Sequence, residues 1–318
     1  IYETVELTKK YGHRGTVGLV NAVLRRLSKR VKKGLPYPEV SDDPAGYLAL
    51  RYYHPLWLIN EWLNQFGYQE TETLCQLNNQ PPPVVIRANT LKIGLEALVE
   101  RLQLEEHNGL KRSRLVPEGL ILEKLGSAET SFSFREGLFY IQDEGSQLVS
   151  HALGPVSGAV VIDACAAPGG KSTHLAQLMG NKGTILAADV HSGRLELIKD
   201  NCRRLGVTCV QTLLLDARQL GSRYRGIADY LLIDAPCSGT GVLRRRADIR
   251  WRQELDRIRE LAQLQLEILL GARQTLKLGG ILIYSTCSVA PEENEQVIQK
   301  FLAEAKEFSL VPLELPVI

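Results

Sequence analysis

The sequence lacks the long apolar runs and the export signal that would place a chain in or across a membrane. It contains no run of about 18 apolar residues, the length that a membrane-spanning helix needs. Residues 1–10 are polar and contain no apolar segment of the kind found in signal peptides. We therefore expect a cytoplasmic protein that has no membrane partner.

A strong net charge is also absent, because 38 lysines and arginines nearly balance 36 aspartates and glutamates. Some of the basic residues form two clusters. The first contains Arg25, Arg26, Lys29, Arg30, Lys32 and Lys33, and the second contains Arg244, Arg245, Arg246, Arg250 and Arg252. Such clusters favour a polyanionic partner that is gripped locally. Solvated helix ends would explain either cluster alone.

The third absence concerns cysteine spacing. The sequence has six cysteines, but no two of them have the C-x-x-C spacing of common zinc sites. We therefore expect no bound metal. In a cytoplasmic chain the thiols stay reduced, so each cysteine is either a small buried hydrophobe or chemically active.

The first half of the chain mixes helices and short strands. Apolar residues recur at helical spacing over 1–33 and 41–78, and the intervening segment 35–39 contains two prolines, as linkers do. We expect the apolar stripe at 57–66 to pack in a core. Further elements are predicted as strands at 84–89, 120–122 and 138–141 and as a helix at 95–104. Together these elements predict an α+β domain.

From about residue 155 onward, strands and helices alternate. Strands are predicted at 160–163, 184–189, 210–215, 230–234 and 281–285, and helices at 171–179, 192–205, 253–277 and 292–305. Repeated strand–helix units predict a parallel, doubly wound sheet.

Polar residues follow the ends of these strands. Acids occur at four successive strand ends, and three cysteines follow strands closely: Asp163, Asp189, Asp216 and Asp234, with Cys165, Cys237 and Cys287. Ligands of doubly wound sheets bind at the carboxyl ends of the strands, so we expect these side chains at one rim. The alternative is that each acid merely caps the next helix.

The segment from Asp163 to Lys171 links the first parallel strand to the first helix. Its small residues and two glycines let the backbone approach a ligand, and the helix that follows offers free amides. The spacing matches neither G-x-G-x-x-G nor the P-loop. Asp189 suits a ribose diol, and Asp216 suits an adenine amino group. S-adenosylmethionine carries both groups, so we predict it as the cofactor.

Two cysteine motifs, at 234–241 and 285–295, each place a thiol just beyond a strand among small polar residues. This pattern fits methylation of cytosine at carbon 5, because that carbon becomes nucleophilic only after a thiolate adds to carbon 6. Asp234 is placed to neutralise N3 as the adduct forms. Chemistry alone does not decide whether Cys287 or Cys237 is the nucleophile.

These motifs, together with 142–147 and 245–251, resemble the NOP/Sun family of RNA 5-methylcytosine methyltransferases, in particular its RsmB type. The resemblance covers nearly the whole chain and implies a Rossmann-like class I S-adenosylmethionine-dependent methyltransferase domain. It implies that Cys287 is the nucleophile, that Cys237 promotes product release, and that Asp234 contacts the cytosine. It also implies a set of cofactor-binding residues: Cys165, Ala166, Ala167, Pro168, Gly169, Gly170, Lys171, Asp189, Asp216 and Asp234.

The resemblance further implies three regions. Residues 1–35 would be the last helices of a truncated NusB-like RNA-binding domain, 36–150 an α+β RNA-binding domain, and 151–318 the methyltransferase domain. The family's sheet ends in an antiparallel strand pair, of which 308–313 would be the first strand. We expect the sequence to be a fragment that lacks residues at both ends. Ala247 departs from the family, which usually has proline there.

The implied substrate is a cytosine in small-subunit (16S) ribosomal RNA, bound by a monomer, with transfer RNA or another RNA as the alternative. The target base must leave its stack to reach Cys287. Trp251 could stack near that base, but we expect it to be a packed core residue. A DNA cytosine methyltransferase and a non-catalytic RNA-binding scaffold are the competing hypotheses. The pair of cysteine motifs argues against the first, and the presence of Cys237, Cys287 and Lys171 argues against the second.

Overall fold

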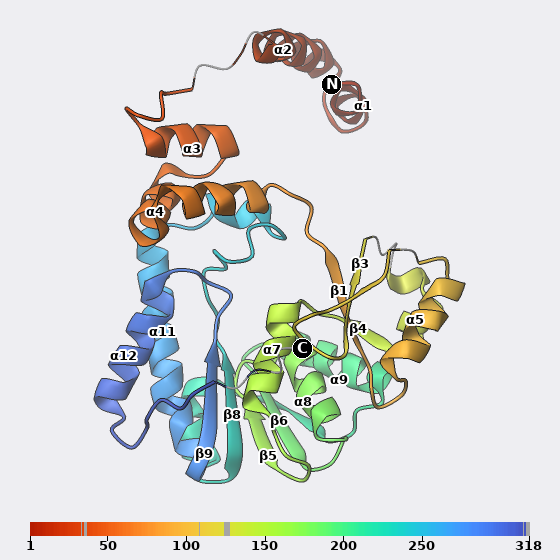
Figure 1. Ribbon diagram of the computed structural model, residues 1–318, viewed down its shortest axis with the longest axis vertical. Helices are drawn as coiled ribbons and strands as arrows, with labels where there is room; N and C mark the ends of the chain where they lie inside the picture. The colour runs from red at the N-terminus through yellow and green to blue at the C-terminus, as the bar shows by residue number, and fades with distance from the viewer. Residues whose placement is uncertain (33, 35–36, 108, 124–127, 314, 316–318) are drawn as a thin grey trace. The chain divides into compact units, whose positions relative to one another are not determined.

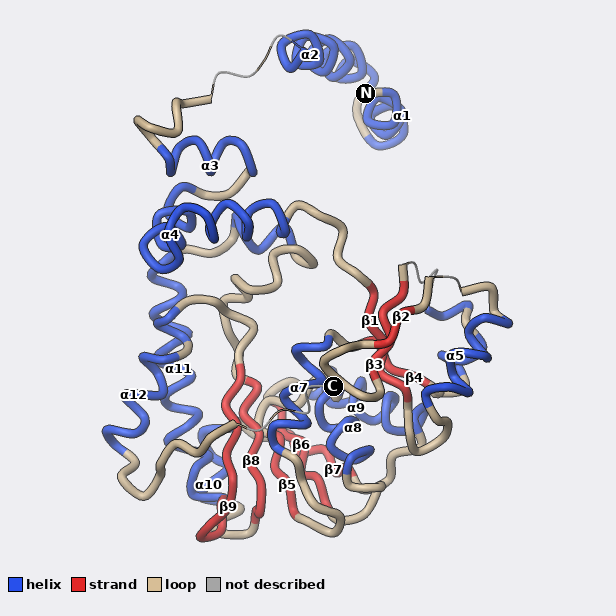
Figure 2. Tube along the Cα trace, viewed as in Figure 1, coloured by secondary structure: helices blue, strands red, loops and turns tan. Residues whose placement is uncertain are grey.

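The computed structural model describes residues 1–32, 34, 37–107, 109–123, 128–313 and 315. The chain divides into two compact units, Ile1–Asn79 and Gln80–Ile318 (Figures 1 and 2). Within the described residues, no helix combines the length and the apolar character needed to cross a membrane. The predicted domain boundaries at 35/36 and 150/151 stay predictions.

The first unit is entirely helical in its described part. It contains α1 (Tyr2–Tyr11), α2 (Arg14–Lys32), α3 (Pro44–Tyr52) and α4 (Leu56–Asn78). Each helix predicted as continuous, over 1–33 and over 41–78, is therefore two helices. Gly12 ends α1 in an extended conformation, and Pro55 disfavours a helical conformation at the residue before it. Trp62 is 1% exposed, as the predicted core stripe requires.

The second unit begins with a four-stranded antiparallel sheet in the order β2-β3-β1-β4. Its strands are β1 (Val84–Ala88), β2 (Lys111–Arg112), β3 (Gly119–Leu122) and β4 (Phe139–Ile141). Helix α5 (Leu95–Leu104) packs its buried residues Leu98 and Leu102 against this sheet, and α6 (Phe132–Arg135) precedes β4. The predicted α+β arrangement is confirmed for this part of the chain.

A five-stranded parallel sheet follows, in the order β7-β6-β5-β8-β9. Its strands are β5 (Val160–Asp163), β6 (Thr184–Asp189), β7 (Val210–Leu214), β8 (Ala228–Asp234) and β9 (Leu276–Ser285). The associated helices are α7 (Glu144–Leu153), α8 (Gly170–Leu178), α9 (Ser192–Leu205), α10 (Leu220–Arg223), α11 (Leu255–Ala272) and α12 (Glu295–Glu304). The order turns back between β5 and β8, so the predicted doubly wound, Rossmann-like sheet is confirmed.

Helices cover both faces of this sheet (Figure 1). Residues of α7, α8 and α9 share one core with Val161 and Leu232, whereas residues of α11 and α12 share another with Ile162 and Leu231. Adjacent residues of one strand thus point into opposite cores, which explains why the strands are apolar throughout. The arrangement holds the carboxyl ends of β5 and β8 side by side.

Two expectations about this unit are wrong, and one helix has no counterpart in the prediction. Helix α7 was not predicted at all, although it lies between β4 and β5. Residues 308–313 form no strand, and the sheet ends at β9. Trp251 is 65% exposed rather than packed in the core, because it lies in the short 3₁₀ helix η3 (Ala247–Trp251) outside both layers of helices.

Candidate active site

A cavity of about 230 Å³ opens where the carboxyl ends of β5 and β8 meet. Its lining comes from β4 and the segment after it, from the loop after β5, and from the end of β8: Tyr140, Ile141, Gln142, Asp143, Ser146, Asp163, Cys165, Ala166, Ala167, Pro168, Gly170, Lys171 and Asp234. The switch point of the sheet therefore carries the cavity, as the predicted topology requires.

The loop after β5 is held in one conformation by its neighbours. Gly169 has φ of 97°, a left-handed conformation that disfavours other residues. A Cβ atom at Gly170 would lie 3.0 Å from the ring of Tyr140. The side chains of Arg194 and Asn201 donate hydrogen bonds to the carbonyl groups of residues 167 and 168. The backbone of this loop therefore lies so close to its neighbours that little room is left for a side chain at Gly170. Glycine-rich loops allow a ligand to approach the backbone in the same way.

A buried arginine of the antiparallel sheet also holds this loop. Arg87 on β1 is 1% exposed and donates to the carbonyl of Gly170 at 2.8 Å and to Oγ1 of Thr173 at 3.1 Å. Burial lowers the pKa of Arg87 to about 9. Sequence analysis gave this residue no role, because no local pattern links position 87 to position 170.

The two acids inside the cavity differ in their environment. Asp163 is 1% exposed, and burial raises its pKa to about 7. Ser172 donates to its Oδ2 at 2.6 Å, whereas its buried Oδ1 has no protein partner. Asp234 is ion-paired with Lys171 at 2.6 Å and accepts from Oγ of Ser285 at 2.8 Å. One acid therefore offers a free acceptor atom and the other a fixed negative charge.

The other two strand-end acids do not line the cavity. Asp189 accepts from the amide of His191 at 2.9 Å, and its Oδ2 lies 3.5 Å from Arg194. Asp216 accepts from both the amide and the guanidinium of Arg218, and these hydrogen bonds lower the pKa of Asp216. The alternative explanation of helix capping thus describes Asp216, which caps the 3₁₀ helix η2 (Ala217–Gln219).

The structure brings two of the three predicted thiols together. The Sγ atoms of Cys237 and Cys287 lie 3.0 Å apart, and the amide of Cys287 lies 3.2 Å from Sγ of Cys237. Cys165 lines the cavity instead, and burial raises the pKa of its thiol far above the ordinary value. The adjacent thiols are therefore those of Cys237 and Cys287.

The two thiols of this pair are not equivalent. The hydrogen bond from Cys237, aided by the charge of Lys171, lowers the pKa of Cys287. The same hydrogen bond, together with burial, raises the pKa of Cys237. Cys287 is also the more exposed of the two. It is thus the thiol that ionises first and the more accessible of the two.

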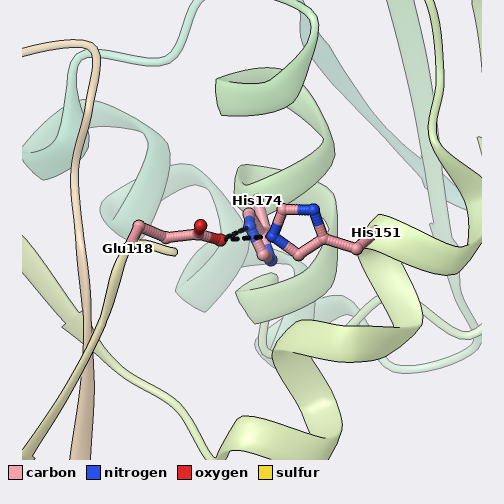
Figure 3. A group of neighbouring side chains, drawn as sticks. All are labelled: Glu118, His151 and His174. Atoms are coloured by element: carbon pink, nitrogen blue, oxygen red, sulfur yellow. Dashed lines mark hydrogen bonds and ion pairs between the residues drawn. The ribbon is translucent and has the colours of Figure 1, made fainter. Parts of the chain in front are cut away.

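A second group of titratable side chains lies away from the cavity (Figure 3). The Nε2 atoms of His151 on α7 and His174 on α8 lie 2.8 and 2.5 Å from Oε1 of Glu118. These three ligand atoms are within 4.8 Å of one another, so they could surround a metal ion. Sequence analysis did not find this group, because its members come from separate segments without a motif.

The three side chains contact one another directly. Both imidazoles approach the same carboxylate oxygen at hydrogen-bond distance. Burial and the nearby positive charge of Arg87 lower the pKa of His174 to about 3. Glu118 therefore ties the antiparallel sheet to α7 and α8.

The second basic cluster is partly used within the protein. Arg244 donates to the carbonyl groups of Gln80 and Pro81, and Arg245 donates to the carbonyl of Pro83 and to the carboxylate of Asp143. These two arginines hold the segment before β1 in place. The clustering alone favoured a polyanionic partner for all of these arginines, because a charge pattern does not reveal which donors are already engaged within the protein.

Residues 140–146 are the part of the cavity wall that received no role from sequence analysis. They include Gln142 and Asp143, from the segment between β4 and α7, and Ser146, from the first turn of α7. The only signal was the match at 142–147 to the family. The polar residues of this motif could have been interpreted as the start of a helix whose first turn faces a ligand.

Known proteins resemble this chain along nearly its whole length. Residues 150–317 match the family described as 16S rRNA methyltransferase RsmB/F, and residues 54–129 match the ferredoxin-like domain of RsmF/B-like methyltransferases. The probable ribosomal RNA small subunit methyltransferase B of Bacillus subtilis is 39% identical over 309 residues, which cover 97% of this chain and 68% of that protein.

Solved structures give the same result. The crystal structure of PH0851 has 36% sequence identity and a TM-score of 0.85, covering 98% of this chain and 68% of that one. The crystal structure of NSun6 from Pyrococcus horikoshii with SFG has 27% identity and a TM-score of 0.71, covering 77% and 86%. From the family match and the extent of these similarities, the chain belongs to the RsmB/F family of 16S rRNA methyltransferases.

Proposed function

We propose that this chain transfers a methyl group from S-adenosylmethionine to carbon 5 of a cytosine in small-subunit ribosomal RNA, through a transient bond between Sγ of Cys287 and carbon 6. The observation that carries this proposal is the pair of thiols 3.0 Å apart, beside a carboxylate that is ion-paired with Lys171. Family membership and the names of the relatives support RNA methylation as the activity.

The cavity residues fit S-adenosylmethionine by their chemistry. The cofactor carries an ammonium, a carboxylate, a ribose diol and a sulfonium that supplies the methyl group. The free Oδ1 of Asp163 can accept a hydrogen bond from a donor of the cofactor, and the amides at the start of α8 suit its carboxylate. The NSun6 structure with SFG, an S-adenosylmethionine analogue, agrees with this assignment.

The protein side chains then have distinct tasks. Cys287 loses its proton more readily because Cys237 donates a hydrogen bond to it, and its thiolate adds to carbon 6 of the cytosine. The ring gains electron density, which is neutralised when N3 takes up a proton. Asp234 would relay that proton from the ammonium group of Lys171, which donates to its Oδ2, while Ser285 holds its other carboxylate oxygen. Carbon 5 then has the electron density that it needs to accept a methyl group.

The second thiol would act after methyl transfer. Carbon 5 passes its proton to a water molecule, the C5–C6 double bond re-forms, and the bond from carbon 6 to Cys287 breaks, so that the thiolate leaves. Cys237 lies within hydrogen-bond distance of that departing sulfur and can stabilise it. We therefore propose that Cys237 promotes product release.

The RNA would be held mainly through its phosphates. The described lysines and arginines of the first basic cluster, from Arg25 to Lys32 on α2, are exposed, whereas Lys33 lies outside the described residues. Arg246 is exposed on the loop after β8, and Trp251, which is also exposed, offers a ring on which an unpaired base can stack. The target base would be flipped toward Cys287.

The deciding experiment measures transfer of labelled methyl groups from S-adenosylmethionine. Small-subunit ribosomal RNA, transfer RNA and double-stranded DNA are compared as acceptors, and the modified base is identified after digestion. We expect 5-methylcytosine in small-subunit ribosomal RNA with the wild-type protein and none with Cys287→Ser. Cys209→Ser, which removes a buried thiol of the methyltransferase fold outside the cavity lining, serves as the matched control. Label in DNA only, or in no acceptor, would contradict the proposal.

A second variant tests the division of labour between the thiols. Cys237→Ala should add to the cytosine more slowly, because Cys287 loses its hydrogen-bond donor, but release should slow further still, so a covalent protein–RNA complex should accumulate on a denaturing gel. Cys237→Ala/Cys287→Ser should form no such complex. If the single variant turns over normally and forms no complex, Cys237 has another role.

A further inference from the structure

Glu293 is a carboxylate buried beneath the two cysteine loops. It lies in the 3₁₀ helix η5 (Pro291–Glu293) and is 0% exposed. Its Oε1 accepts from the amide of Ser238 at 2.8 Å and from Nε2 of Gln265 at 3.0 Å, and its Oε2 accepts from Oγ of Ser238. Ser238 directly follows Cys237, so this carboxylate holds the first cysteine loop, residues 234–241, through Ser238.

The same network reaches the second cysteine loop. Oγ of Ser288, the residue after Cys287, lies 3.1 Å from Oγ of Ser238 and 3.0 Å from Oγ1 of Thr240. The amide of Gly241 donates to the carbonyl of Cys287 at 2.9 Å. The two cysteine loops are thus joined by hydrogen bonds through the residues that follow the cysteines.

The neighbour of Glu293 completes this arrangement. The side chain of Asn294 accepts from Thr286 at 2.6 Å and donates to the carbonyl of Ser288 at 3.0 Å. The residues on either side of Cys287 are therefore both held by Asn294, while Glu293 holds the residue after Cys237. The single turn at 291–294 thus contacts both cysteine loops.

A buried carboxylate is costly unless several donors satisfy it. The groups that donate to Glu293 are uncharged, and they all belong to Ser238 or Gln265. An apolar residue at position 293 would leave the amide of Ser238 and the amide group of Gln265 without their acceptor. The site therefore requires an acceptor here, and its geometry is tied to the first cysteine loop.

We propose that Glu293 is the positioning residue that sets the separation of Cys237 and Cys287, and so the timing of adduct formation and release. The part of this inference that concerns catalysis rests on the proposed function, whereas the part that concerns the thiol separation does not. Glu293 touches neither thiol in the network described above. It acts through Ser238 and, by way of Ser288, on both loops.

The hydrogen-bond pattern distinguishes position from charge. Only Oε1 accepts two hydrogen bonds, whereas Oε2 faces a single hydroxyl that can also accept. In Glu293→Gln the amide oxygen can take the place of Oε1, and the amide nitrogen can donate to Oγ of Ser238. Glu293→Gln should therefore keep both loops in place, whereas Glu293→Ala should release them.

The test measures the thiol separation directly, with diamide as oxidant. The two thiols form an Sγ–Sγ bond, and their two protons and two electrons pass to the N=N bond of diamide, which becomes a hydrazine. Peptide mapping by mass spectrometry follows the Cys237–Cys287 disulfide and ignores the other cysteines. Glu295→Ala, an exposed acid on the first turn of α12, is the matched control.

We expect wild type, Glu293→Gln and Glu295→Ala to close the disulfide at rates within about 3-fold of one another, and Glu293→Ala at least about 10-fold more slowly, because loss of position reduces effective concentration. Single-turnover methyl transfer by Glu293→Ala should fall about 10- to 100-fold with the KM for S-adenosylmethionine unchanged, as a misplacement near 1 Å would cause. Glu293→Gln should restore both. Wild-type rates of both processes in Glu293→Ala would overturn the inference.

Two further outcomes are also decisive. If Glu293→Ala does not fold, as judged by thermal melting, Ser238→Ala replaces it, because it removes only the hydroxyl that joins Glu293 to Ser288. Disulfide closure and methyl transfer at wild-type rates in Ser238→Ala would then overturn the inference. If the wild-type protein methylates no RNA but the disulfide rates follow the expected order, the positioning role stands and the proposed function fails.

Discussion

The acids that end β5 and β8 and the acids that end β6 and β7 come from one sequence pattern but lie in different environments. Asp163 and Asp234 line the cavity, where one has an unpartnered oxygen and the other is paired with Lys171. Asp189 and Asp216 accept hydrogen bonds from residues two positions further along the chain. The sheet order explains the difference, because only β5 and β8 meet at the switch point. A strand-end acid is thus a better candidate ligand the closer its strand lies to that point.

The largest effect should come from Asp234→Asn. The change removes the partner of Lys171 and the group proposed to neutralise N3, so single-turnover methyl transfer should fall at least about 100-fold, or ~2.7 kcal/mol of barrier. Asp229→Asn, at the other end of the same strand, is the control. A loss below about 3-fold in Asp234→Asn would remove the distinction between the inner and outer acids.

The next effect is on stability and concerns Asp163. Its folded pKa of about 7 lies above the unfolded value of 3.8, so the folded state binds more protons between these pH values. This group therefore makes the protein less stable as pH rises from 4 to 7, by at most ~1.4 kcal/mol per pH unit. Asp163→Asn lacks that dependence, so its stability relative to wild type should increase with pH.

Denaturant unfolding of wild type and Asp163→Asn at pH 5, 6 and 7.5 measures this difference. The variant leaves a buried amide with incomplete hydrogen bonding, so its absolute stability can be lower at every pH. The test therefore depends on how the difference in unfolding free energy between the variant and wild type changes with pH. A difference that is constant from pH 5 to pH 7.5 would mean that Asp163 is ionised throughout this range.

A smaller effect is expected for Asp189→Asn. We propose that Asp189 accepts hydrogen bonds from the ribose of the cofactor, although it does not line the cavity of the protein alone. The KM for S-adenosylmethionine should rise about 10-fold with kcat nearly unchanged, because ground-state and transition-state binding weaken together. Initial rates at several cofactor concentrations give both constants. A drop in kcat instead would place Asp189 nearer to the chemistry than β6 suggests.

The smallest effect should belong to Asp216→Asn. Both oxygens of its carboxylate already accept hydrogen bonds from Arg218. Little acceptor capacity is therefore left for an adenine amino group. We expect less than about 3-fold change in the KM for S-adenosylmethionine and a loss of ~0.5–1 kcal/mol in stability from the weakened cap. A 10-fold rise in KM would show that Arg218 gives way to the cofactor.

Much of the parallel sheet could be predicted because its strands are apolar throughout and end in polar residues. The segment 184–189 is an example: both faces of β6 are covered, so the sequence shows a continuous apolar run before Asp189. Helix α7 could not be predicted in this way, since 142–147 attracted attention as a motif rather than as a helix start. Residues 308–313 have strand-like composition but no neighbouring strand to pair with.

The site could be predicted only where its residues are neighbours in sequence. Cys237 and Cys287 lie in motifs, so their meeting followed from the order of strands. Glu118, His151 and Arg87 lie in no motif and are joined only by packing between the antiparallel sheet and the helices. Trp251 shows a further limit, because its residue type favoured burial while its place in a short 3₁₀ helix left it exposed.

The most direct test of the central claim identifies the sulfur that bonds to the pyrimidine. Small-subunit ribosomal RNA containing 5-fluorocytidine blocks loss of the substituent at carbon 5, so the covalent complex cannot proceed to release. After nuclease and protease digestion, mass spectrometry locates the modified peptide. We predict the nucleotide on the peptide that contains Cys287. A nucleotide attached to Cys237, or no covalent complex under conditions that support methylation of unmodified RNA, would contradict the account.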